Sequence, residues 1–358
     1  MTAWSDNAWP DHLAALIGNT PLLELKRFGG RQTSPCRILA KIEYLNPAGS
    51  IKDRTAWGII RAAEADGHLR PGQTLVDLTS GNTGIGLAAL AAARGYRAKF
   101  YLRASTSPEK IGLIHQYGAR TILIDDAEFL QPGAVDLIID RVRQENPEAF
   151  YTNQRGNPAN PRIHFETTGP EIWRDTAGAV DILVSAVGTG GTVSGTGRYL
   201  KSQKPGLKVV VVEPAAGSVP TPDHPDVDTV EGVHKVTEVE AQHLPGNYDS
   251  GVVDAVIACE TAQARLTARA LARDEGLTAG PSSGAVLFAA AQLAARQENA
   301  GRTIVAIVAD SGERYLSQPG VEGDRTPHPA PAPQRRSGAW SSQPIRTGPK
   351  PSYYGPLG

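Results

Sequence analysis

The chain has 358 residues, and its 36 Lys and Arg residues almost balance its 37 Asp and Glu residues, giving a net charge of −1. Apolar residues make up 40% and charged residues 20%, as in an ordinary globular protein with room for one large core or two domains. This charge balance gives no support for nucleic-acid or membrane partners, and the apolar runs are too short to span a bilayer. We therefore expect a protein that acts on small molecules.

The cysteines and the N-terminus bear on location. Cys36 and Cys259 are the only cysteines, and neither stands in a CxxC pair or near a His pair. We expect no metal site and two free thiols, which suit a reducing cytoplasm. No basic region followed by an apolar run opens the chain, so we predict no signal peptide and a cytoplasmic protein.

Strand-like and helix-like segments alternate along most of the chain. Short apolar segments predict strands, and apolar residues at helical spacing predict helices. The predicted strands are 38–43, 74–78, 98–102, 121–124, 182–187, 208–213 and 303–308, and a turn at 18–22 leads into a further strand. The predicted helices are 11–17, 53–65, 84–94, 108–117, 133–145, 162–175, 193–202, 262–274 and 284–296. The stretch 209–212 is wholly Val, which indicates a strand buried on both faces of a parallel sheet.

This alternation predicts an α/β fold made of βαβ units with mostly parallel sheets. We expect two three-layer αβα domains, with a break near 156–158 where Gly, Asn and Pro follow one another. The proline-rich stretch 217–251 predicts a long irregular connection, which is usually functional or mobile. The residues 319–358 are rich in Pro, Ser and Gly and predict a disordered tail.

The stretch 46–54, which reads NPAGSIKDR, joins the first predicted long strand to a helix. Ser50 fits the N-cap of that helix, so Lys52 would lie at the positive end of the helix dipole. An ammonium is unfavourable there, which favours a lysine used for chemistry, because lysine forms Schiff bases with carbonyl groups. The alternative is a solvated lysine beside Asp53.

Two further loops of small residues precede predicted helices, TSGNTG at 79–84 and GTGGT at 188–192. Backbone N–H groups of such loops suit an anion at a helix N-terminus, and an ordinary turn is the alternative for each. Residues 84–89 also match the dinucleotide pattern G-x-G-x-x-A. The next strand lacks the acidic residue which that interpretation requires. The stretch 281–284, PSSG, would by itself most often be a helix cap.

Together these stretches resemble the cysteine synthase/cystathionine β-synthase family of pyridoxal-phosphate (PLP) enzymes, which have the tryptophan synthase β type of fold (fold type II). The motifs at 46–54, 79–84, 154–160, 167–173, 188–192 and 282–284 occur in the family's order, and the resemblance covers roughly 11–318. It implies PLP in a cleft between a large domain of residues 1–45 and 158–318, which binds the phosphate, and a small mobile domain of residues 46–157. It also implies a homodimer.

The resemblance gives the motif residues their expected roles. Lys52 would hold PLP as an imine and act as the catalytic acid and base. The other cofactor-binding residues would be Asn82 at the ring's 3′ oxygen, Ser282 at the pyridine nitrogen, and Gly188, Thr189, Gly190, Gly191 and Thr192 at the phosphate. The substrate's carboxylate would be bound by Thr79, Ser80, Thr83 and Gln154.

The implied reaction is a β-replacement on an O-activated L-serine, either O-acetylserine or O-phosphoserine, through an α-aminoacrylate. The simplest nucleophile is sulfide, which gives L-cysteine, so the chain would be a transferase or lyase. One alternative is another nucleophile: homocysteine, which gives cystathionine, or an amine or other specialised nucleophile, which gives a nonproteinogenic amino acid. Another is a noncatalytic binding protein of the same fold.

Two departures from the family concern the site's entrance. Val230 to Val233 match the start of a family segment that borders the entrance, but residues 234–246 do not match the rest of it. Arg155 follows Gln154 where the family usually has Phe or Tyr. Its guanidinium could recognise a phosphate or a second carboxylate, and the alternative is a surface arginine paired with an acid.

Overall fold

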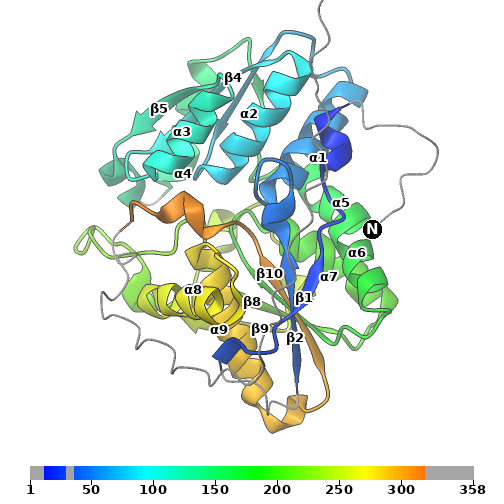
Figure 1. The fold of residues 1–358 in the computed structure, drawn as a ribbon. Coiled ribbons are helices and arrows are strands. Elements are labelled where there is room, and N and C mark those ends of the chain that lie inside the picture. Colours follow the sequence, from blue (N-terminus) through cyan, green and yellow to red (C-terminus); the bar gives the residue numbers. More distant parts are fainter. Residues whose placement is uncertain (1–11, 30–35, 132, 319–358) are drawn as a thin grey trace, which may run out of the picture. The chain divides into compact units, whose positions relative to one another are not determined.

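The computed structural model of the chain describes residues 12–29, 36–131 and 133–318, all within one unit of the chain (Figure 1). Strands and helices alternate through this part as predicted. The expected disordered tail at 319–358 lies outside the described residues.

The strands are β1 (Leu22–Glu24), β2 (Arg37–Ile42), β3 (Thr74–Leu78), β4 (Arg97–Arg103), β5 (Arg120–Ile124), β6 (Phe150–Tyr151), β7 (Ile182–Ala186), β8 (Lys208–Pro214), β9 (Ala255–Cys259) and β10 (Thr303–Val308). The α-helices are α1 (Lys52–Ala65), α2 (Asn82–Arg94), α3 (Pro108–Gln116), α4 (Ala134–Gln144), α5 (Ala159–Ile163), α6 (Gly169–Asp175), α7 (Gly191–Gln203), α8 (Thr261–Glu275) and α9 (Pro281–Ala295).

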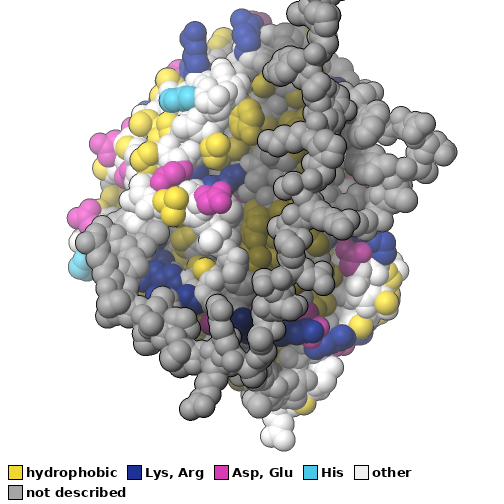
Figure 2. Space-filling view, in the orientation of Figure 1, with side chains coloured by type: hydrophobic (Ala, Val, Ile, Leu, Met, Phe, Trp, Pro, Cys, Tyr) yellow, Lys and Arg dark blue, Asp and Glu magenta, His cyan; other side chains and the backbone are white. Residues whose placement is uncertain are grey.

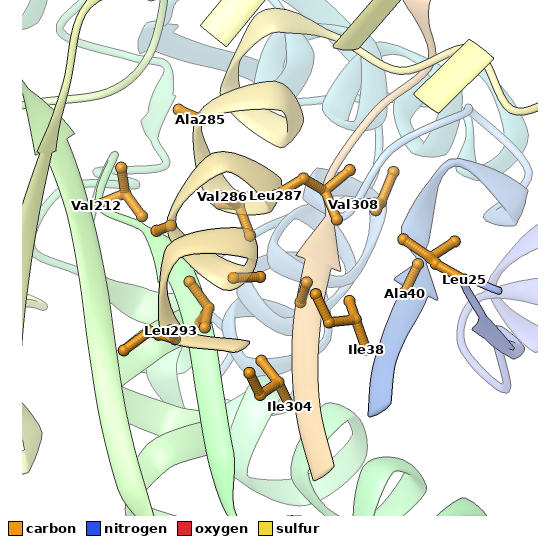
Figure 3. Close-up of a cluster of buried hydrophobic side chains, with 14 of the residues drawn as sticks. Leu25, Ile38, Ala40, Val212, Ala285, Val286, Leu287, Leu293, Ile304 and Val308 are labelled. Atoms are coloured by element: carbon orange, nitrogen blue, oxygen red, sulfur yellow. The ribbon is translucent and has the colours of Figure 1, made fainter. Parts of the chain in front are cut away.

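The larger sheet has the order β1-β2-β10-β7-β8-β9, and all its pairs are parallel except β1 with β2. Successive side chains of a strand point to opposite faces. On one face, alternate residues of β2, β7, β8 and β10 pack with α9, as Figure 3 shows for Ile38, Val212 and Ile304. On the other face, Leu183, Val211 and their neighbours pack with α7 and α6. The strands are apolar because both faces are covered.

The smaller sheet has the order β5-β4-β3-β6 and is wholly parallel. Leu75 and Phe100 pack on one face with α1, α2 and α3. Val76 and Tyr101 pack on the other face with α4. Both sheets are thus covered by helices on two faces, which confirms the predicted α/β class with two αβα units.

The predicted strands match the observed ones closely, and the errors have physical reasons. Two observed strands were not predicted: β6, which has two residues, and β9, whose half-exposed residues lie at the sheet's edge. Helices α2, α7 and α9 begin two or three residues earlier than predicted. Their first turns hold Asn, Gly, Ser, Thr and Pro, which have low intrinsic helix propensity, so the sequence pattern favours loops there. The predicted helix 11–17 is a 3-10 turn over Leu13–Leu16.

The predicted helix 162–175 is interrupted. Helix α5 ends at Ile163, a π-helical turn covers His164–Thr168, and α6 follows from Gly169. Pro170 lacks the N–H that a regular α-helix needs at an interior position. Because the π-helical turn precedes Pro170, no regular α-helical hydrogen bond is needed from this residue. The turn also brings His164 toward α7, where His164 Nε2 lies 3.2 Å from Thr192 Oγ1.

Candidate active site

Lys52 lies at the positive end of α1, as the sequence predicted, and is the first residue of the helix, which begins one residue earlier than expected. The prediction that Ser50 caps this helix is wrong by one residue, because Ile51 occupies the cap position and has helical backbone angles. Ser50 instead forms a β-bridge with Asp310. Its hydroxyl still accepts a hydrogen bond from the Lys52 N–H at 3.2 Å, so it satisfies one of the free amides of the first turn.

The Lys52 amine has no hydrogen-bond or ion-pair partner among the described residues. Burial lowers its pKa, and the nearby Asp310 carboxylate opposes this by raising it. No hydrogen bond or ion pair joins this amine to Asp53, whose Oδ2 accepts from the Ala48 N–H at 2.6 Å. Burial also raises the pKa of Asp53 to about 7. The interpretation of Lys52 as a solvated lysine beside Asp53 is therefore not supported, and the amine is free for chemistry.

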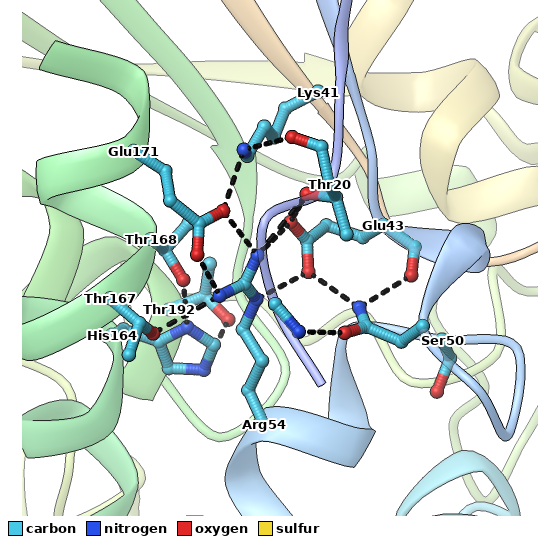
Figure 4. A network of polar contacts seen from close by, with 12 residues as sticks. Thr20, Lys41, Glu43, Ser50, Arg54, His164, Thr167, Thr168, Glu171 and Thr192 are labelled. Carbon is cyan, nitrogen blue, oxygen red and sulfur yellow. Dashed lines mark hydrogen bonds and ion pairs between the residues drawn. The ribbon is translucent and has the colours of Figure 1, made fainter. Parts of the chain in front are cut away.

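A buried charge network fixes the first turn of α1 to the larger sheet (Figure 4). The Arg54 guanidinium donates to Glu43 at 2.8 and 3.0 Å and to Glu171 at 2.7 Å through two nitrogens. Lys41 donates to Glu171 at 2.8 Å. All four side chains are buried, and two positive charges face two negative ones. Because Arg54 lies two residues after Lys52, the network also fixes where the Lys52 backbone lies relative to β2 and α6.

This network predicts an acid-dependent loss of stability. Burial acts to raise the pKa of Glu171, but Arg54 and Lys41 outweigh it and lower the pKa to about 2. The unfolded chain therefore takes up this proton first, and the Glu171 contribution is lost as pH falls from about 4.5 toward 2. We expect the cost of Glu171→Gln, measured as the free energy of urea unfolding relative to wild type, to shrink by about 2 kcal/mol between pH 5 and pH 3.

Glu166→Gln is the matched control, because Glu166 is exposed on the preceding π-helical turn and pairs with the exposed Arg61. Its small cost should show no comparable change with pH. Equal pH trends for the two variants would contradict the assignment of acid sensitivity to the buried network.

The TSGNTG stretch lies at the carboxyl end of β3 and runs into α2. Thr79 Oγ1 accepts from the N–H groups of Gly81 and Gly84 at 3.1 and 3.3 Å, which shapes the loop. Gly81 has φ 118°, and a Cβ there would lie 2.6 Å from Lys110 Cδ, so this turn requires glycine. Ser80 is exposed, and its hydroxyl has no partner among the described residues. The loop thus presents a free hydroxyl at a helix N-terminus, which suits an anion.

Gln154 lies beside this loop, as the carboxylate-binding prediction requires. Thr83 Oγ1 donates to Gln154 Oε1 at 2.5 Å, and Gln154 Nε2 donates to the Leu78 carbonyl at 2.8 Å. Arg155 follows and is half-buried. Burial lowers its pKa, and the charges of Asp136, Tyr151 and Asp77 raise it. Its guanidinium nevertheless has no hydrogen bond or ion pair within the part of the chain that the structure describes.

The GTGGT stretch follows β7 and leads into α7. Gly190 has φ 83°, and a Cβ on Gly191 would lie 2.0 Å from Asn160 Oδ1. Thr189 Oγ1 accepts from Asn160 Nδ2 at 2.9 Å. The first amides of α7 have no intrahelical acceptor. Glycines that allow a close approach at an electropositive helix end fit a phosphate group.

Ser282 and Asn82 complete the predicted cofactor set. Ser282 lies in the first turn of α9, is half-buried, and has no hydrogen-bond partner among the described residues. Asn82 is the first residue of α2 and lies between Asp310 and Arg314. Sequence reasoning missed Asp310 and Arg314, which follow β10 in a segment that none of the quoted motifs includes.

The dinucleotide alternative fails on geometry. Gly84 and Gly86 lie inside α2 rather than in the turn before it. A Cβ on Gly86 would lie 3.2 Å from the Lys52 carbonyl, so this glycine allows α2 to pack closely on α1. Its role is structural.

The described residues also bear on the general expectations. No described helix combines the length and apolar character needed to cross a membrane. Within the described ranges, no group of His, Cys, Asp or Glu side chains could hold a metal ion. Neither Cys36 nor Cys259 forms a disulfide among the described residues, and both side chains are buried. Charged side chains of both signs are dispersed over the face shown in Figure 2.

The residues present fit PLP. A lysine amine without a partner, a glycine loop at a helix N-terminus and a free serine hydroxyl at another helix start match the three polar ends of the cofactor: its aldehyde, its phosphate and its ring nitrogen. Lys52, Gly188–Thr192, Ser282 and Asn82 are the residues that would hold it. They belong to the starts of α1, α7, α9 and α2.

Comparisons with known proteins agree with this geometry. Residues 13–310 match the family described as "Pyridoxal-phosphate dependent enzyme". The chain is 41% identical over 305 residues to cysteine synthase 3 of Caenorhabditis elegans, covering 84% of this chain and 87% of that one. It is 38% identical over 310 residues to a cysteine synthase of Staphylococcus aureus, covering 86% and 96%.

Two solved structures are also similar. A cysteine synthase of Entamoeba histolytica has a TM-score of 0.73 and 39% identity, covering 87% of this chain and 90% of that one. An O-ureido-L-serine synthase has a TM-score of 0.76 and 35% identity, covering 89% and 98%. The chain therefore belongs to the pyridoxal-phosphate dependent enzymes, among the relatives of cysteine synthase, and its cofactor is pyridoxal 5′-phosphate.

Proposed function

We propose that this protein catalyses a β-replacement on O-acetyl-L-serine or O-phospho-L-serine, with sulfide as the first-choice nucleophile and L-cysteine as the product. The observation that carries this proposal is the Lys52 amine, which lies without a partner at the start of α1. The relatives named cysteine synthase support the choice of sulfide.

The residues of the chain would divide the work in the following way. When bound, PLP withdraws electron density from the substrate's α-carbon. Lys52 would take the α-proton and later return it, and burial helps because it lowers the pKa of Lys52 and so favours the neutral amine. The Ser80 hydroxyl and the α2 N-terminus would bind the α-carboxylate together with Thr79, Thr83 and Gln154, whose hydrogen bonds also hold the loop in shape. The negatively charged leaving group then departs from an oriented substrate.

The test of this function is a matrix of two activated serines against several nucleophiles. Wild type is incubated with O-acetylserine or O-phosphoserine, together with sulfide, homocysteine or an amine, and the product is identified by mass. We expect cysteine as the fastest product. The Ser282→Asp variant should be slower, because a carboxylate at this position would keep the ring nitrogen protonated. Consumption of serine ester with no replacement product for any nucleophile would overturn the proposal.

Arg155 favours a second candidate, in which one of the partners carries an additional anion. The segment 234–246 borders the expected entrance, and hydrogen bonds at its two ends hold it, one of them to the Arg155 backbone. At one end Glu213 accepts from the N–H groups of Val236 and Thr237 at 2.8 and 2.9 Å. At the other end the Asn247 N–H donates to the Arg155 carbonyl at 3.1 Å. An unpaired guanidinium beside the entrance suits a phosphate leaving group or a nucleophile with its own carboxylate.

We expect Arg155→Ala to lose about tenfold to a hundredfold in kcat/KM for an anionic partner, because a charge-assisted hydrogen bond contributes about 1.5–3 kcal/mol. It should lose little for O-acetylserine with sulfide. Steady-state kinetics with each pair of substrates checks this. Equal losses for charged and uncharged partners would make Arg155 a structural residue and leave a plain O-acetylserine cysteine synthase.

Three further expectations accompany this function and are proposals as well. The enzyme would be a homodimer, it would be cytoplasmic, and residues 46–157 would close over the bound amino acid. Closure would exclude water from the reacting centre. The rotation of this segment between structures with and without an amino acid tests it.

A further inference from the structure

Asn82 is held at both ends of its side-chain amide by charged groups. Its Nδ2 donates to Asp310 Oδ2 at 2.6 Å, and its Oδ1 accepts from Arg314 Nη1 at 2.6 Å. A carboxylate only accepts and a guanidinium only donates. Rotating the amide by half a turn would therefore turn its oxygen toward the Asp310 carboxylate and its N–H groups toward the Arg314 guanidinium, and both contacts would be repulsive. The amide has one stable orientation.

The two charged partners are themselves fixed. Asp310 is fully buried, and its Oδ2 also accepts from Tyr315 Oη at 2.5 Å. A Cβ on Gly280 would lie 2.2 Å from Asp310 Oδ1, so the carboxylate fits only because a glycine precedes α9. Arg314 is buried as well and donates through its other nitrogen to the Ala48 carbonyl in the loop before Lys52. The carboxylate and the guanidinium therefore form a rigid holder.

One amide proton of Asn82 remains, and it has no acceptor among the described residues. An –NH₂ group has two protons, of which Asp310 takes one. The other is free for an oxygen of a ligand. If Asn82 binds the 3′ oxygen of the cofactor, Asp310 and Arg314 fix the amide so that Asn82 presents an N–H, and not its carbonyl, to that oxygen.

We propose that Asp310 and Arg314 are positioning residues that fix the Asn82 amide with an N–H toward the cofactor. The inference rests on the proposed function for the assignment of Asn82 to the cofactor. It goes beyond it by giving a role to a segment after β10 that no motif singled out. The simpler alternative is that the two charged residues only join the α2 start and the loop before α1 to the end of β10.

A double-mutant cycle separates the two interpretations. The variants are Asp310→Asn, Asn82→Ala and both together, with Glu313→Gln as control, since Glu313 is exposed in the same segment. The measurements on each holoenzyme are the PLP dissociation constant, from cofactor release, and the visible absorption band of the bound cofactor. Circular dichroism reports whether the fold is kept.

We expect Asp310→Asn to weaken PLP binding about fivefold to tenfold and to change the absorption band, because a neutral acceptor replaces a charged one. In the Asn82→Ala background the same change should have less than about a twofold effect, because Asp310 acts through Asn82. Glu313→Gln should match wild type.

The proposal would be overturned if the effects of Asp310→Asn and Asn82→Ala on the PLP dissociation constant multiplied in the double variant. It would also be overturned if Asp310→Asn kept the wild-type PLP affinity and absorption band. If Asp310→Asn fails to fold, Arg314→Lys and Arg314→Met are compared by the same readouts. Lysine can still donate to Asn82 Oδ1, so a lysine variant that binds PLP no better than the methionine variant would overturn the proposal too. A wild type that binds no PLP would refute the proposed function instead.

Discussion

Lys52→Ala is expected to lose at least about a thousandfold in the rate of β-replacement while it keeps the native fold. The amine has no partner among the described residues, so its removal leaves no polar group orphaned in the protein. Alanine is also the best helix former, and the first turn of α1 should be kept. The loss would arise because the start of α1 has no second unpaired amine, among the described residues, that could exchange the α-proton in place of Lys52. Steady-state assays with O-acetylserine and sulfide measure the rate, and circular dichroism measures the fold.

Lys26→Ala is the matched control, because Lys26 is exposed and follows β1 at a site with no predicted chemistry. Its rate should equal that of wild type. A Lys52→Ala variant that retained more than about a tenth of the wild-type rate would mean that another group exchanges the proton, and the catalytic assignment of Lys52 would be wrong.

The second large effect is on stability. We expect Arg54→Met to lower the free energy of unfolding by about 3–5 kcal/mol, because removing one partner leaves buried charges uncompensated. Glu43 loses its charged partner, and Glu171 keeps Lys41 as its one charged partner among the described residues. Urea unfolding at pH 7 measures this loss. Glu43→Gln in the Arg54→Met background should recover part of it, because it removes the uncompensated charge.

Arg61→Met serves as the comparison, since the Arg61–Glu166 pair is exposed and lies on the same helix as Arg54. An exposed pair contributes at most about 1 kcal/mol. If Arg54→Met cost no more than Arg61→Met, the buried network would not be what fixes α1 to the larger sheet.

Local pattern predicted the strands well because burial on both faces leaves little choice of residue. The stretches ending at Leu78 and Val308 match the observed strands to the residue. The same logic fails where burial is partial, as in β9 at the sheet's edge. It also fails at helix starts such as Gly191, where the residues that make a good anion site are poor helix formers.

The sequence predicted the site as a set of separate motifs, but it could not predict the contacts between them. The motifs give Lys52 and Asn82 as separate positions in the chain. That Asn82 is held by Arg314, 232 residues away, follows only from the fold. The same is true of Arg54 and Glu171, which are 117 residues apart. Such pairs depend on how β2, α1, α6 and the segment after β10 meet in space, which periodicity does not report.

Reduction of the holoenzyme with borohydride followed by peptide mapping tests the central claim most directly. The claim is that Lys52 is the lysine that carries the cofactor. The account predicts that the peptide containing Lys52 gains the mass of one phosphopyridoxyl group and that no other lysine is modified to a comparable extent. A stable label on a different lysine, such as the buried Lys41 or Lys110, or a holoenzyme with no labelled lysine, would contradict it.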